Sequence, residues 1–277
     1  MKISNSSNTR KIILFAVVAL AAVFVWVFHT NTRSCEKEEP LVIAYGDDIA
    51  GLVLQKALKD LPAERADIGL DAINMGDCCG SNAQFALSTG EVDVAVLCPD
   101  AMIDLEETGK MYTVLGELVY DGNVLVRRPD SPSELSVIGY MNGRDEQRQL
   151  LEKVFGTDKE LQPMFASALP YALENQAVDA IMLDAALALK LNYPTESISE
   201  DMVTSVMIVR DELVSDVRLQ DLIAGYNDAV ESLADEDILI EMLCDYLETE
   251  DKEEVAAFWK TVTVQFGSLS EGIKRKP

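Results

Sequence analysis

Two twelve-residue segments of this chain align without a gap, 86 positions apart. Residues 86–97 read ALSTGEVDVAVL and residues 172–183 read ALENQAVDAIML. Each begins with Ala-Leu, has Val-Asp six residues later and ends in Leu. The pattern is that of a helix end, a turn and a buried strand. It predicts two similar α/β lobes in tandem, with convergence on common helix–strand patterns as the alternative.

The rest of the chain repeats this alternation of short apolar runs and segments with helical 3–4 spacing. Continuous apolar runs are typical of parallel strands covered on both faces, so we expect a small parallel sheet in each lobe. Strands are expected at 41–46, 68–75, 92–97, 135–141, 161–165, 178–183 and 202–210. Helices are expected at 49–61, 81–89, 144–155, 168–175, 184–191, 217–233, 237–248 and 251–266. Residues 113–129 read as extended chain with a turn at Asp121-Gly122.

The charge of the chain is strongly negative, −25 in total. Residues 1–29 hold Lys2, Arg10 and Lys11 and no acidic residue, so the remainder carries 20 basic and 48 acidic residues. Such a surface repels phosphate backbones, and we expect no nucleic-acid partner. Whether the charge attracts cations or serves solubility stays open.

The amino-terminal region holds an apolar run, residues 12–28, preceded by Arg10-Lys11. With its flanks, a helix of this length reaches across a hydrocarbon core of about 30 Å. We expect a cytoplasmic tail at 1–11, a transmembrane or signal anchor at 12–29 and a linker at 30–40, with the body on the extracytoplasmic side of the cell membrane. The alternatives are a cleaved signal peptide and a lipoprotein modified at Cys35, whose preceding residues do not match a lipobox.

Several phrases of the body resemble the type II periplasmic-binding-protein-like solute receptors of ABC importers. They are LVIAYG, SNAQFALSTGEVDVAVL, LGELVYDGNVLVRRPDS and LSVIGYMNGRDEQRQLLEKVFG. The likeness points to the sulfonate, nitrate and thiamine-precursor branch and covers about residues 41–266. It implies an α/β fold of two lobes, residues 41–121 plus 206–277 and residues 122–205, with hinges near 120–123 and 205–209. It also implies a small ligand in the cleft, an ABC permease and its ATPase.

Candidate ligand contacts follow from the rule that open parallel sheets bind ligands beyond the carboxyl ends of their strands. The candidates are Asp47, Asp48, Gly80, Ser81, Asn82, Asp100, Asn142, Gly143, Arg144, Ser167 and Asp184. The resemblance places its own ligand contacts at 80–82, where a helix N-terminus follows a glycine. Arg144 suits a carboxylate or sulfonate. The aspartates suit an amine or a metal cation, or simply cap helices, so the charge of the ligand stays open.

The cysteines allow three interpretations. Cys78, Cys79 and Cys98 lie in neighbouring predicted loops, where a disulfide, buried free thiols or a soft-metal site are all possible. The body contains no histidine, since His29 borders the apolar run. The lack of histidine argues against the metal site. We predict no metal site, no cofactor and no catalytic residue, and we expect Cys244 in the core.

The sequence favours a membrane-tethered solute-binding protein that closes two lobes around its ligand. One alternative is an enzyme on the same fold, similar to thiamine-precursor synthases or to dehydratases. The segment DCCGS weakly resembles the Cys-rich motif of those synthases. Another is an extracellular sensory module. A phosphate-binding GxxxxGK[ST] motif is absent from the sequence, so an ATPase would be a separate chain.

Overall fold

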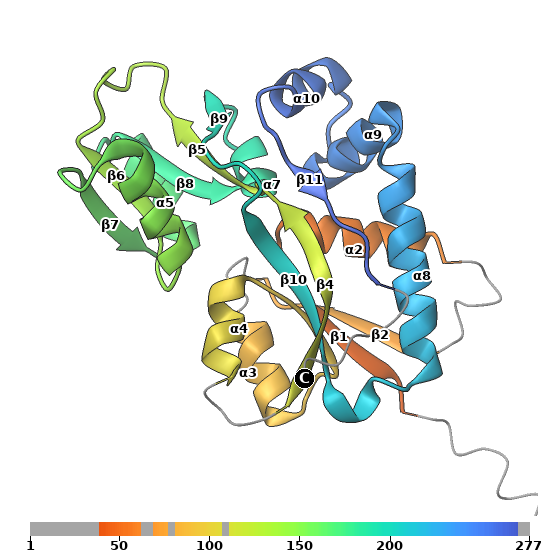
Figure 1. Ribbon diagram of the computed structural model, residues 1–277. Coiled ribbons are helices and arrows are strands. Elements are labelled where there is room, and N and C mark those ends of the chain that lie inside the picture. The colour runs from red at the N-terminus through yellow and green to blue at the C-terminus, as the bar shows by residue number, and fades with distance from the viewer. Residues whose placement is uncertain (1–38, 62–68, 77–80, 107–110, 271–277) are drawn as a thin grey trace, which may run out of the picture. The chain divides into compact units, whose positions relative to one another are not determined.

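The computed structural model of the protein describes residues 39–61, 69–76, 81–106 and 111–270 (Figure 1). All of them except Glu39 belong to one unit, residues 40–277. Among these described residues, no helix combines the length and the apolar character needed to cross a bilayer. The predicted membrane segment, residues 12–29, and the linker before Glu39 lie outside them.

The first sheet, sheet A, has six strands in the order β11-β4-β10-β3-β1-β2. β1 pairs in parallel with β2 and β3, and β10 runs antiparallel between β3 and β4. The strands are β1 (Leu41–Tyr45), β2 (Leu70–Asn74), β3 (Val94–Leu97), β4 (Tyr112–Tyr120), β10 (Val203–Arg210) and β11 (Gln265–Phe266). The helices between them are α2 (Ile49–Lys59), α3 (Ser81–Thr89) and α4 (Pro99–Glu106).

The second sheet, sheet B, has five strands in the order β7-β6-β8-β5-β9. They are β5 (Asn123–Arg127), β6 (Val137–Met141), β7 (Glu160–Met164), β8 (Ala180–Asp184) and β9 (Thr195–Ser197). The connecting helices are α5 (Asp145–Phe155), the short η2 (Ala166–Ala168), α6 (Leu169–Glu174) and α7 (Ala185–Leu189). The order β7-β6-β8-β5 matches β2-β1-β3-β10 of sheet A, so the two sheets share one plan and the predicted pair of α/β sheets is confirmed.

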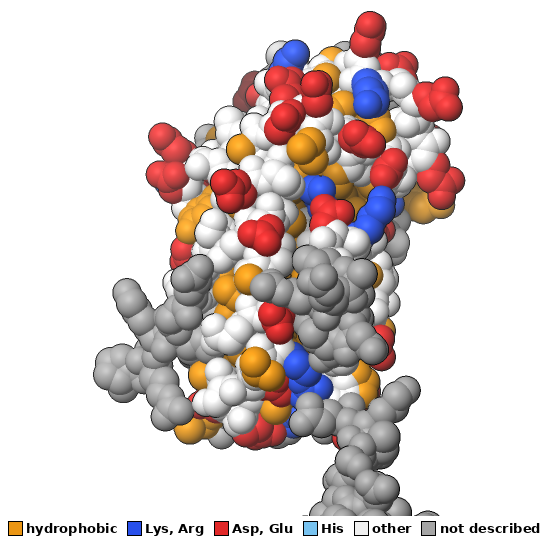
Figure 2. Space-filling model, turned by 90° about the vertical axis from the view of Figure 1, so that its right-hand side faces the viewer, with side chains coloured by type: hydrophobic (Ala, Val, Ile, Leu, Met, Phe, Trp, Pro, Cys, Tyr) orange, Lys and Arg blue, Asp and Glu red, His pale blue; other side chains and the backbone are white. Residues whose placement is uncertain are grey.

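The carboxyl-terminal part of the chain packs against sheet A. After η3 (Asp211–Leu213) come α8 (Val217–Ser232), α9 (Glu236–Leu247) and α10 (Lys252–Trp259). Side chains of α8 and α9 share one apolar core with those of β1 and α2, including the fully buried Ile43, Val53, Tyr226 and Leu243. Figure 1 shows α2 and α8 next to each other, with their axes crossing at a steep angle. On the face shown in Figure 2, acidic side chains outnumber lysines and arginines, as the composition of the chain requires.

The duplicated phrase of the sequence forms the same hydrogen-bonded link in each sheet. In sheet A the N–H of Asp93 donates to the carbonyl of Val42 (2.8 Å), and the Asp93 carboxylate accepts the N–H of Val42 (2.9 Å). In sheet B, Asp179 makes the same pair of bonds to Val137, at 2.8 and 3.0 Å. Each aspartate therefore ties the start of one strand, β3 or β8, to its parallel neighbour in the same sheet, β1 or β6.

The turn before each aspartate is also repeated. Gly90 and Gln176 both adopt positive φ, 83° and 61°. The N–H of the residue after each one donates to the carbonyl of Ala86 or Ala172, at 2.9 Å in both copies. Gly90 thus ends its helix as expected, and Gln176 holds the same left-handed conformation with a side chain, at a conformational cost that glycine avoids.

The structure differs from the sequence expectations in five respects. The sheets are mixed, because β10 and β5 return antiparallel through the long extended segments. Helix α4 was missed; it begins at Pro99, which suits the first turn of a helix. The helix expected at 251–266 is wrong beyond Trp259, where the β-branched run Thr261–Val264 disfavours helix and leads to β11. Residues 205–209, expected at the second connection between lobes, lie inside β10, and the short β9 was not anticipated.

Candidate functional site

The chain passes between the sheets twice, and one buried residue ties the two passages together. The first is Asp121-Gly122, between β4 and β5; the second is 198–202, between β9 and β10. Asp121 is 1% exposed and has a φ of 54°. Its carboxylate accepts the N–H groups of Asp201 and Met202, each at 3.0 Å, and its own N–H donates to the Met202 carbonyl at 2.8 Å. The two crossovers therefore form one hydrogen-bonded unit.

Gly122 extends this unit to the helix that follows β8. Its N–H donates to the Thr204 hydroxyl (3.2 Å), and its carbonyl accepts the N–H of Ala185 at the start of α7 (2.8 Å). A Cβ here would lie 2.7 Å from the Thr204 oxygen and 2.9 Å from a methyl group of Val119. Only glycine fits the crossover without a shift of its neighbours.

Two buried carboxylates meet at the start of α2. Asp48 follows β1 and caps α2, accepting the N–H of Gly51 at 2.7 Å. Asp184 ends β8 and caps α7, accepting the N–H of Ala186 at 2.9 Å. Asp184 also accepts the N–H of Ile49 at 3.0 Å, across 135 positions of the chain. One carboxylate from each sheet thus binds the first turn of the same helix.

Arg144 brings a positive charge to this pair. It follows β6, precedes α5 and is 6% exposed. Its charge acts on Asp48, Asp184 and Asp100. Burial raises the pKa of Asp48 to about 6, against the opposing effects of the Gly51 N–H and Arg144. Burial, and then the charge of Asp48, raise the pKa of Asp184 well above its ordinary value.

A third acidic residue reaches the same edge from α4. The Asp100 carboxylate accepts the N–H of Glu146, in the first turn of α5, at 3.4 Å. Its other oxygen is buried and has no hydrogen-bond partner within the described part of the chain. Burial raises the pKa values of both Asp100 and Glu146, and Arg144 opposes the rise in each.

Lys190 links the outer edge of the cluster to α9. Its ammonium nitrogen lies 3.3 Å from a carboxylate oxygen of Asp47 and 4.1 Å from the centroid of the Tyr246 ring. Burial raises the pKa of Tyr246, and the charge of Asp47 adds to the rise. Sequence reasoning missed Lys190, Tyr246 and Glu146. One signal could have indicated Lys190: it lies in the helix expected at 184–191, which begins at the candidate residue Asp184. In contrast, the sequence pattern of α9 gives no sign that Tyr246 lies near β1.

The structure brings together five of the eleven predicted contact residues: Asp47, Asp48, Asp100, Arg144 and Asp184. Of the remaining six, Asn82, Asn142, Gly143 and Ser167 are described, and no hydrogen bond or ion pair among the described residues joins these four to the cluster. Asn82, Asn142 and Ser167 are exposed, and the Asn82 amide donates to the Met75 carbonyl at 3.5 Å. Gly143 is exposed, with a φ of 77°. Gly80 and the Ser81 side chain lie outside the described residues, as does Asp77.

The structure describes two of the cysteines for which predictions were made, Cys98 and Cys244. Cys98 is buried, and its sulfur accepts the N–H of Ala101 at 3.4 Å, in the first turn of α4. Cys244 is buried in the core of sheet A, as expected. Cys78 and Cys79 fall outside the described segments, so the three interpretations of Cys78, Cys79 and Cys98 stay open. The described residues hold no group of three or more His, Cys, Asp or Glu side chains suited to a metal ion.

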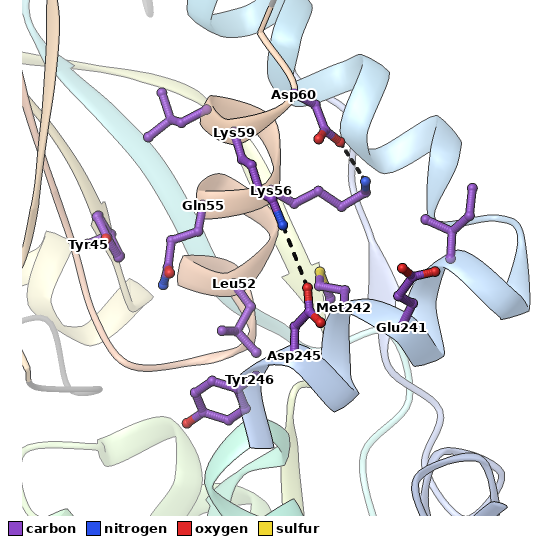
Figure 3. A pocket seen from close by; sticks show the side chains of 12 residues that line it. Tyr45, Leu52, Gln55, Lys56, Lys59, Asp60, Glu241, Met242, Asp245 and Tyr246 are labelled. Atoms are coloured by element: carbon purple, nitrogen blue, oxygen red, sulfur yellow. Dashed lines mark hydrogen bonds and ion pairs between the residues drawn. The ribbon is translucent and has the colours of Figure 1, made fainter. Parts of the chain in front are cut away.

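A cavity of about 700 Å³ lies between α2 and α9 (Figure 3). Exposed ion pairs at its rim join Lys56 to Asp60 (2.6 Å) and Lys59 to Asp245 (3.6 Å), and such pairs contribute little stability. Tyr246 lines this cavity as well as contacting Lys190. The other lining residues are Tyr45, Leu52, Gln55, Leu58, Ile238, Glu241 and Met242.

Comparison with known proteins gives a fold and no sequence family. No protein-family model and no curated protein matches the chain. A solved ligand-binding component of an ABC-type import system from Staphylococcus aureus, with zinc bound, superposes with a TM-score of 0.63 at 14% identity, covering 84% of this chain and 86% of that one. The chain has the periplasmic-binding-protein fold.

Two sulfonate-binding proteins of this fold are similarly close. The alkanesulfonate-binding protein SsuA from Xanthomonas axonopodis pv. citri, bound to MOPS, gives a TM-score of 0.63 at 16% identity, over 85% of this chain and 89% of that one. The periplasmic aliphatic sulphonate binding protein from Escherichia coli gives 0.60 at 16% identity, over 83% and 86%. In the periplasmic-binding-protein fold of this chain, the Asp48, Asp184 and Arg144 side chains lie at the carboxyl ends of strands from both sheets.

Proposed function

We propose that this protein is an extracytoplasmic solute-binding protein of an ABC importer, which holds a small molecule between two lobes. The lobes would be residues 41–121 plus 206–277 and residues 122–205, except that Val203–Ser205, as part of β10 in sheet A, would move with the first lobe. The observation that carries the proposal is the meeting of Asp48 from sheet A with Asp184 and Arg144 from sheet B. Ligands of open α/β sheets bind beyond the carboxyl ends of the strands, which is where these side chains lie.

The proposed ligand contacts divide into two groups. Asp47, Asp48, Asp100, Arg144 and Asp184 form the floor, where hydrogen bonds and charges already join the two sheets. Arg144 would bind an acidic group of the ligand through its fork of donors, and the carboxylates would bind an amine or hydroxyl group. Gly80, Ser81, Asn82, Asn142, Gly143 and Ser167 would form the rim.

The mechanism would be closure about the paired crossovers. Asp121 holds the two passages together, so the lobes would turn about one hinge at 121–122 and 198–202. A ligand that contacts both lobes stabilises the closed state over the open one by its differential affinity. No chemical step is required.

The partners would be an ABC permease and its ATPase, with residues 12–29 tethering the body to the membrane. Solved binding components of import systems share the fold, which supports this assignment. The GxxxxGK[ST] phosphate-binding motif is absent from the sequence, which agrees with an ATPase on another chain.

The test is thermal unfolding with a panel of sulfonates, carboxylates, amines, pyrimidines and zinc. A true ligand at about 100 times its dissociation constant stabilises the fold by about 2.7 kcal/mol and raises Tm. The Arg144→Gln variant should lose that gain, whereas Arg148→Gln, which changes a half-buried arginine of the following helix α5, should keep it. Recovery of an altered compound by mass spectrometry would favour an enzyme instead. A flat response across the panel would contradict the proposal.

A further inference from the structure

The first turn of α2 receives two carboxylates but offers limited positive charge. Asp184 binds the N–H of Ile49, and Asp48 binds the N–H of Gly51. Both aspartates are buried, at 5% and 8% exposure. A helix N-terminus supplies roughly half an elementary charge. Two ionised carboxylates at one buried helix end therefore carry more negative charge than that end can balance.

The charged groups described around the pair do not neutralise this excess negative charge. Arg144 faces both aspartates, but its charge is shared with Asp100 and Glu146. Lys190 lies against Asp47 rather than against the pair. Tyr226 of α8 and Tyr246 of α9 face the pair as neutral phenols, since burial raises the pKa of each. Within the described part of the chain, the titratable and charged groups around the pair are Asp47, Asp100, Arg144, Glu146, Lys190, Tyr226 and Tyr246.

We propose that Asp48 and Asp184 share one proton near neutral pH, and that this proton links the contact between sheets A and B to pH. Two buried carboxylates at one site do not both ionise readily, because each charge disfavours the other. The pair then titrates as a unit, and the proton belongs to both residues. If the proposed function holds, the proton also tunes closure, because Asp184 supplies the bond between the sheets.

The pKa values of the pair agree with this. Burial, the largest cause, lifts the pKa of Asp48 from 3.8 to about 6, and Asp184 rises well above its ordinary value. Because both values are raised in the folded protein, it binds more protons than the unfolded chain between about pH 4 and the folded pKa values. The stability contributed by the shared proton is therefore present at the acid end of this window and lost as the pH rises through it.

The first test is infrared titration of the full chain, without ligand. The carbonyl stretch of a protonated carboxylic acid should be present at pH 6 and disappear at higher pH. In Asp48→Asn and in Asp184→Asn, this titration should move to lower pH or vanish. Asp235→Asn, which changes the exposed cap of α9, should leave it unchanged. Asparagine keeps an acceptor oxygen, so each variant can still cap its helix.

The second test is urea unfolding at pH 4 and pH 7. Between these pH values the unfolding constant of the wild type should rise by roughly a hundredfold more than that of Asp48→Asn, since two pKa units correspond to a factor of 100. Amide exchange at Ile49, corrected for its intrinsic pH dependence, should accelerate as the proton leaves. A missing acid band, or pH profiles unchanged in both variants, would overturn the shared proton. A chain that binds no solute would still pass these tests, so the two proposals fail separately.

Discussion

The carboxylate of Asp184 accepts the backbone N–H of Ile49 at 3.0 Å, so a residue that ends a strand of sheet B caps a helix of sheet A. The same carboxylate also caps its own helix through Ala186. One side chain thus caps two helices, one that follows a strand of sheet A and one that follows a strand of sheet B. It is a direct polar link between the regions that we expect to move as lobes.

Replacing Asp184 with alanine should therefore cost more than replacing it with asparagine. Alanine leaves the N–H groups of Ile49 and Ala186 without their acceptor, which costs about 1–3 kcal/mol for a buried group. Asparagine keeps an acceptor and removes a charge that burial disfavours. Urea unfolding at pH 7 should place Asp184→Ala below Asp184→Asn by about this amount. Equal stabilities would show that the bond across the sheets contributes nothing.

Substitution of Asp121 should also destabilise the fold, for a different reason than substitution of Asp184. Its carboxylate binds two N–H groups of the second crossover, and its φ of 54° lies where asparagine is tolerated better than alanine. Asp121→Ala should lose roughly 2–4 kcal/mol, from two unsatisfied donors and backbone strain. Asp121→Asn should lose about half as much, since the amide has one acceptor oxygen. Denaturant unfolding measures both, and matching losses would contradict this role.

Asp93 and Asp179 should respond to substitution as a matched pair. Asp179 accepts the N–H groups of Ser136 and Val137, and Asp93 accepts the N–H of Val42 and pairs with Arg210. Alanine at either position should destabilise the fold by about 1–3 kcal/mol, and asparagine by less. A large loss at one position with none at the other would mean that the repeat has no shared structural role.

The two aspartates also illustrate what the sequence could predict. Val-Asp before an apolar run, written twice, predicted the correct number of sheets and the correct positions of β3 and β8. The aspartate is repeated because the same backbone pair needs an acceptor in each sheet. Such local patterns are readable, because a strand and its preceding turn are set by neighbouring residues.

The candidate site was harder to predict from the sequence, because its contacts join distant parts of the chain. Asp48 and Asp184 could be named as loop residues or helix caps, but not as partners at one helix end. Tyr246 reaches the cluster through the packing of α9 on α2, which no period in its sequence encodes. The segment that forms β4 and β5 was expected only as extended chain, and β10 was expected as a strand, but the antiparallel direction of β5 and β10 depends on how the chain crosses between sheets.

The amino-terminal prediction has a simple test. If residues 12–29 are a retained anchor, the protein expressed in bacteria should sediment with membranes and release only with detergent. Its mass should equal that of the full 277-residue chain. A shortened soluble product would indicate a cleaved signal peptide, and a mass increase on a chain beginning at Cys35 would indicate a lipoprotein.

Backbone amide chemical shifts, followed while a ligand from the thermal screen is added, test the central claim most directly. The account predicts that residues 47–49, which follow β1 of sheet A, and residues 142–144, which follow β6 of sheet B, shift together, with one dissociation constant. Residues 121–122 and 201–202 of the crossovers should shift with them. Shifts confined to Gln55, Met242 and their neighbours around the cavity between α2 and α9 would contradict it, because the ligand would then bind one side of the fold and leave the site between the sheets empty.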